Sequence, residues 1–81
     1  MNNVLVIVNG QLALIRAYME AVTELYVDSP NQSNMYRFLA EQTWDDTRVL
    51  LDIVKRTYPD EFKDYSSQLQ DIILNLDLEF E

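Results

Sequence analysis

Hydrophobic residues return at alternating steps of three and four positions from Val4 to Tyr26. One series consists of Leu5, Val8, Leu12, Ile15, Met19, Val22 and Tyr26. An adjoining series consists of Val4, Ile7, Leu14, Tyr18, Ala21 and Leu25. This spacing follows the period of an α-helix and predicts a helix over about residues 3–27. Because the two series adjoin, the helix is apolar over a wide arc, which favours burial on two sides or against a second chain.

Two proline-containing segments mark the ends of further helices. Ser29 and Gln32 have the spacing of an N-terminal capping box, with Pro30 at the first helical position. Pro59 cannot continue a preceding helix but can open the next one. Hydrophobic residues keep helical spacing after both prolines, so we predict helices over about residues 30–57 and 59–76. The fold class predicted is all-α, a small antiparallel three-helix bundle that makes residues 1–81 one domain.

The two ends of the chain also allow a different fold. Residues 3–8 are rich in β-branched side chains and are followed by Asn9 and Gly10, a pair that is poor in helices and common in turns. Residues 74–80 alternate apolar and acidic positions with the period of a strand. An α+β alternative therefore pairs strands at about 3–8 and 74–80.

The composition removes most catalytic and metal chemistry from consideration. The 81 residues include no cysteine and no histidine, and Gly10 is the only glycine. Nucleophilic Ser–His and Cys–His pairs, thiolate zinc sites and glycine-rich phosphate loops are thereby excluded. The acidic groups at 45–46, 60–64 and 77–81 fall on polar helix faces or helix starts, where carboxylates are usually solvated. We expect no enzyme activity, no cofactor and no metal site.

The net charge of −8 is concentrated in the second half of the chain. Residues 1–40 carry two basic and three acidic residues, whereas residues 41–81 carry four basic and eleven acidic residues. Such a surface repels nucleic acid and anionic lipid, and suits a protein partner with a basic surface. Mimicry of DNA is a minor alternative. The apolar run near the start is broken by polar residues and lacks a preceding basic segment. It predicts neither a signal peptide nor a membrane span, and we expect a cytoplasmic protein.

Trp44 is the leading candidate for a partner-binding residue. It lies in a polar stretch beside Glu41, Asp45 and Asp46, and an aromatic side chain ringed by acids is a reasonable anchor for a basic partner. The alternative is that Trp44 fills the core, with its N–H bonded near a helix end. Further partner-binding candidates are Tyr36, Tyr58, Asp60 and Glu61.

These observations favour a small, acidic, non-catalytic protein that binds and regulates or inhibits a larger partner. Immunity proteins, antitoxins, secretion chaperones and phage-encoded regulators of host proteins share this composition, but no stretch of the sequence matches a motif of theirs. The alternative is a structural homo-oligomer, such as a homodimer that pairs through the first helix. Its interface candidates are Leu5, Val8, Leu12, Ile15 and Met19.

Overall fold

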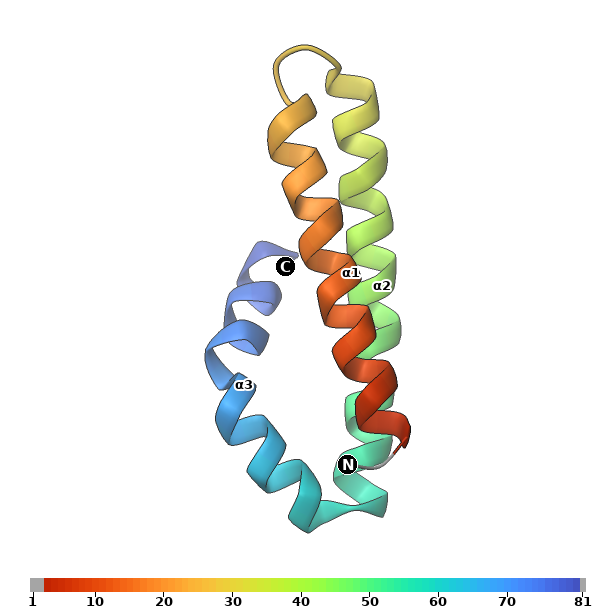
Figure 1. Cartoon of the computed structure of the whole chain (residues 1–81), viewed down its shortest axis with the longest axis vertical. Helices are drawn as coiled ribbons and strands as arrows, with labels where there is room; N and C mark the ends of the chain where they lie inside the picture. The colour runs from red at the N-terminus through yellow and green to blue at the C-terminus, as the bar shows by residue number, and fades with distance from the viewer. Residues whose placement is uncertain (1–2, 81) are drawn as a thin grey trace.

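Residues 3–80 are described by a computed structural model and form three helices joined by short connections (Figure 1). The helices are α1 (Asn3–Leu25), α2 (Pro30–Thr57) and α3 (Pro59–Glu79). The all-α prediction is confirmed. The described residues contain no strand, so the alternative with strands at 3–8 and 74–80 is wrong. Helix α1 ends two residues earlier than predicted, and α3 continues three residues further.

Both segments with strand-like sequences are helical because their packing outweighs local preference. Helix α1 passes through Asn9 and Gly10 without a positive φ angle. A glycine inside a helix costs about 1 kcal/mol relative to alanine, and burial of Leu5 and Val8 on the same turns offsets that cost. At the other end, Phe80 packs against the core cluster, which favours helical rather than extended backbone there.

Helices α1 and α2 form a long antiparallel hairpin (Figure 1). Pro30 is the first residue of α2, as its sequence position predicts. The predicted capping box is wrong, because the Ser29 side chain makes no capping hydrogen bond. The Ser33 hydroxyl instead donates to the carbonyl oxygen of Val22 at 2.8 Å. That bond joins the two helices beside the turn.

The core lies mainly along the contact between α1 and α2. Its fully buried members include Val8 and Ile15 from α1 with Trp44 and Val54 from α2. Tyr65 is the only residue of α3 classed as buried among those described. Helix α3 therefore adds one buried aromatic ring and several half-buried side chains to a core that the hairpin already forms.

Helix α3 packs on α2 and stands away from α1 (Figure 1). Within residues 3–80, no Cα atom of α3 comes within 8 Å of a Cα atom of α1. The described part of the molecule is correspondingly elongated, with extents of 45 × 20 × 18 Å. The space between α1 and α3 is where the candidate site lies.

Helix α1 also has the length and mean hydropathy of a membrane-crossing helix. Core helices of soluble proteins and signal sequences share these properties, so this observation does not by itself establish a membrane span.

Candidate functional site

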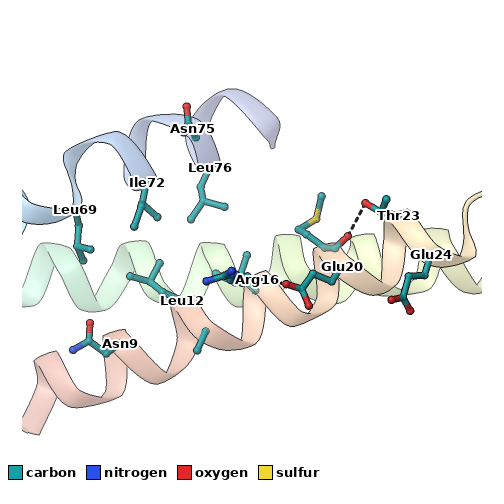
Figure 2. Close-up of a pocket in the computed structure, with 13 residues that line it drawn as sticks. Asn9, Leu12, Arg16, Glu20, Thr23, Glu24, Leu69, Ile72, Asn75 and Leu76 are labelled. Atoms are coloured by element: carbon teal, nitrogen blue, oxygen red, sulfur yellow. Dashed lines mark hydrogen bonds and ion pairs between the residues drawn. The ribbon is translucent and has the colours of Figure 1, made fainter.

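An elongated apolar groove of about 910 Å³ separates α1 from α3 (Figure 2). Its apolar lining comes from Leu12, Ala13, Ile15, Met19, Leu69, Ile72 and Leu76. In Figure 2, Leu69, Ile72 and Leu76 point from α3 toward the hairpin, and Leu12 points back toward them. Two helices thus present apolar side chains to one shared space.

The rim of the groove is polar and carries more acid than base. Arg16, Glu20 and Glu24 line it on the α1 side, and Asn75 lines it on α3. The Arg16 Nε and Glu20 Oε1 atoms are 3.5 Å apart, but both side chains are mostly exposed. An exposed pair of this kind contributes little stability, so Arg16 and Glu20 remain available to a bound molecule.

Polar contacts hold α3 to the hairpin near both of its ends, on either side of the groove-lining residues. Near its first half, the Tyr65 hydroxyl donates a hydrogen bond to Asn9 Oδ1 on α1. At its last turn, Arg37 of α2 donates to Glu79, with 2.7 Å between Nη1 and Oε1 and 3.1 Å between Nη2 and the carbonyl oxygen. The Arg37 guanidinium also lies 5.7 Å from the centre of the Phe80 ring. Between these contacts, Leu69, Ile72 and Leu76 line the groove.

Burial raises the pKa of the Tyr65 hydroxyl above its ordinary value. The neutral phenol is the form that the fold favours, because desolvation penalises the phenolate. The stabilisation is fully present below the ordinary tyrosine pKa of about 10 and is lost as the pH rises from there through the raised pKa.

We therefore expect the urea midpoint of the protein to fall as the pH is raised above about 10, in part because Tyr65 ionises. The Tyr65→Phe variant lacks the ionising group, so its midpoint should fall less. The measurement is urea unfolding by circular dichroism at a series of pH values for both proteins. Parallel curves for the two proteins across the alkaline range would contradict this role of Tyr65.

The structure places Trp44 in the core rather than on the surface. Only 1% of its surface is exposed, so the prediction of an exposed anchor is replaced by its alternative. The large indole supplies apolar area to the core cluster, which also contains Ile15 of α1 and Tyr65 of α3. The expected hydrogen bond at a helix end is absent: Trp44 Nε1 has no hydrogen-bond partner among the described residues.

The other partner-binding candidates do not assemble into one site. Tyr36 is half-buried and packs against Tyr18 of α1, with ring centres 6.1 Å apart. Tyr58 is exposed at the junction of α2 and α3, and none of the predicted partner-binding candidates lines the groove. The exposed acidic candidates are Glu41, Asp45 and Asp46 on α2 and Asp60 and Glu61 at the start of α3.

The predicted oligomer-interface residues divide between the core and the groove. Leu5, Val8 and Ile15 are buried in the molecule's own core, and Ile15 also borders the groove from below its surface, so in this fold none of the three is available to a second chain. Leu12 and Met19 are half-buried and line the groove. The α3 side of the groove was missed, although Leu69, Ile72 and Leu76 share one helical stripe. Sequence spacing cannot show that this stripe lacks a facing helix.

Among residues 3–80, no three acidic side chains lie together as a metal site would require. The sequence matches no protein-family model, and neither a curated protein nor a solved structure shows significant similarity to it.

Proposed function

We propose that the protein binds a larger protein partner by taking an amphipathic helix of that partner into the groove between α1 and α3. The observation that carries this proposal is the apolar groove itself, open along one side and lined from two helices. An added helix would cover Leu12, Met19, Leu69 and Ile72 and complete a four-helix arrangement. Helix-in-groove recognition of this kind relies on apolar anchors spaced by three and four residues.

The dimensions and charge of the groove specify the partner segment. The α1 wall runs from Asn9 to Glu24, which is about 22 Å at the helical rise. A partner helix of about four turns fits that length. The rim acids Glu20 and Glu24, together with the net charge of −8, favour basic residues beside the apolar anchors. Regulation would follow from occupying that partner segment.

The test uses a synthetic amphipathic peptide of about sixteen residues, with leucines on one face and lysines on the other. Ile72 is 46% exposed and lines the groove, so Ile72→Glu should weaken peptide binding at least tenfold without unfolding α3. The matched control is Leu78→Glu, because Leu78 is 64% exposed on the same helix and does not line the groove. Fluorescence anisotropy gives the dissociation constants, and circular dichroism checks the helical content.

Equal affinities for Ile72→Glu and Leu78→Glu, or no binding of the lysine peptide to the unaltered protein, would overturn the proposal. A version of the peptide with glutamate in place of lysine should bind more weakly, and the difference should shrink at high salt. The same two variants then serve to identify the natural partner. The natural partner should be a protein that Leu78→Glu captures and Ile72→Glu does not. It should also bind the unaltered protein directly when both are purified.

A further inference from the structure

Helix α1 carries a second apolar surface that faces neither α2 nor the groove. It consists of Val6, Ile7, Gly10, Leu14, Ala17 and Ala21, which we call the outer face of α1. At 100° per residue, these positions fall within one arc of the helix. Val6, Ile7 and Leu14 are 56%, 51% and 43% exposed. Glu24, at the end of the helix, falls at the same helical angle as Val6 and is the charged residue at the edge of this face.

The exposure of this face is unusual for so apolar a helix. In the most apolar 18-residue window of α1, only 17% of the residues are buried. A bilayer is one cover for such a helix, but a spanning α1 would have to bring Arg16 and Glu20 into the hydrocarbon region. Each charge there costs about 2.5–3.5 kcal/mol by insertion measurements. A chain of net charge −8 is also repelled by anionic lipid.

We propose that the outer face of α1 pairs with the same face of a second copy, in antiparallel orientation. The sizes of the side chains are self-complementary in that orientation. An antiparallel pair centred near residue 12 would set Leu14 opposite Gly10 and Ile7 opposite Ala17. A Cβ atom added at Gly10 would meet nothing within 4 Å, so there is open space for an opposing side chain. Leu14 and Ile7 then each meet a small residue, and two-fold symmetry repeats both contacts.

The charges of α1 favour the antiparallel orientation over the parallel one. Acids are absent from the first turn of α1, and bases are absent from its last turn. Glu20 and Glu24 lie near the C-terminal end of α1, where the helix dipole is negative. Parallel pairing would set these acids beside their own copies. Antiparallel pairing sets them beside the positive start of the other α1. This distribution of charge suits a second copy in the antiparallel orientation.

The expected association is weak, because a single pair of helices buries less than the roughly 1,200 Å² typical of stable complexes. We expect a dissociation constant on the order of 10–100 µM. Sedimentation equilibrium should be run from about 1 µM to about 1 mM. Ala17→Glu should weaken the dimer at least tenfold. Ile72→Glu adds the same charge in the groove and should change the dissociation constant of the dimer by less than twofold.

A protein that stays monomeric over the whole concentration range would overturn the inference, as would equal effects of Ala17→Glu and Ile72→Glu. Binding to phosphatidylcholine vesicles, lost in Ala17→Glu, would also overturn it in favour of a lipid cover. Circular dichroism of both variants establishes that the helices are retained. The groove proposal is tested separately by the peptide, so the failure of one leaves the other standing.

Cross-linking tests the orientation, because the chain has no cysteine of its own. A mixture of the Gly10→Cys and Leu14→Cys proteins should oxidise to a mixed disulfide dimer, since these positions are opposite one another in the antiparallel pair. The Ala17→Cys protein alone should give little dimer, because residue 17 faces residue 7. Efficient self-cross-linking of Ala17→Cys would show parallel pairing and contradict the proposed arrangement.

Discussion

Replacement of Trp44 by alanine is expected to remove about 3–5 kcal/mol from the free energy of unfolding, because it leaves a large cavity in the core. The indole is 1% exposed and is the largest fully buried side chain among those described. An 81-residue domain has a total stability of only about 4–12 kcal/mol at typical values per residue. The variant should therefore be largely unfolded or close to unfolding at room temperature. Urea unfolding measures this loss of stability. It should be followed by circular dichroism rather than by tryptophan fluorescence, because the substitution removes the only tryptophan.

Trp44→Phe provides the matched control for the indole N–H. Trp44 Nε1 is buried without a hydrogen-bond partner in the described residues, and an unsatisfied buried donor costs about 1–3 kcal/mol. Phenylalanine removes that donor while it keeps most of the apolar area. The free energy of unfolding of Trp44→Phe should lie within about 1 kcal/mol of that of the unaltered protein, because these two effects oppose each other. A loss as large as that of Trp44→Ala would show that Nε1 is bonded.

Helical spacing was sufficient to predict the fold because the apolar positions of each segment bury one face. Pro30 and Pro59 then set the two boundaries, since proline is tolerated at the first turn of a helix and not in its interior. The strand-like ends could not be resolved in the same way. Residues 74–80 alternate by two, but the end of α3 is fixed by Arg37, which is forty-two residues before Glu79. No local pattern contains such a contact.

The candidate site was harder to predict than the fold because it depends on which apolar stripes lack a facing helix. Leu12 and Leu76 look like ordinary core residues in the sequence, and both pack against the core cluster. Only the separation of α1 and α3 turns them into the walls of a groove. Trp44 left two readings open in the sequence, because the acids next to it point to an exposed site whereas its size suits the core, and the structure decides for the core.

The outer face of α1 also could not be recognised from the sequence alone. The sequence predicts a helix that is apolar over a wide arc, and this is what suggests a second chain. The residues predicted from the sequence for a homodimer interface include ones that the fold buries, such as Val8 and Ile15. Small residues at Gly10 and Ala17 give little hydrophobic signal of their own. The proposal for these two positions therefore depends on the structure, which shows that the opposite side of α1 is buried against the hairpin core.

Replacement of Tyr65 by alanine is expected to release α3 while the α1–α2 hairpin stays folded. Tyr65 is 7% exposed, is the one buried residue of α3 among those described, and carries the hydrogen bond to Asn9. Truncation of a buried aromatic residue costs about 3–5 kcal/mol. The hairpin keeps Val8, Ile15 and Val54 buried between its own helices, so α3 is the part that loses its support. Amide hydrogen exchange by NMR should then show protection lost in α3 before it is lost in α1 and α2.

Tyr26→Ala is the matched control, because Tyr26 is 72% exposed and should change stability by less than about 0.5 kcal/mol. Loss of the α3 wall must also remove the groove, so Tyr65→Ala should bind the lysine peptide at least tenfold more weakly. Self-association through the outer face of α1 should persist, since that face belongs to the hairpin. Uniform loss of protection in all three helices would instead mean that α3 and the hairpin fold as a single cooperative unit, in which case the groove could not open or close independently of the core.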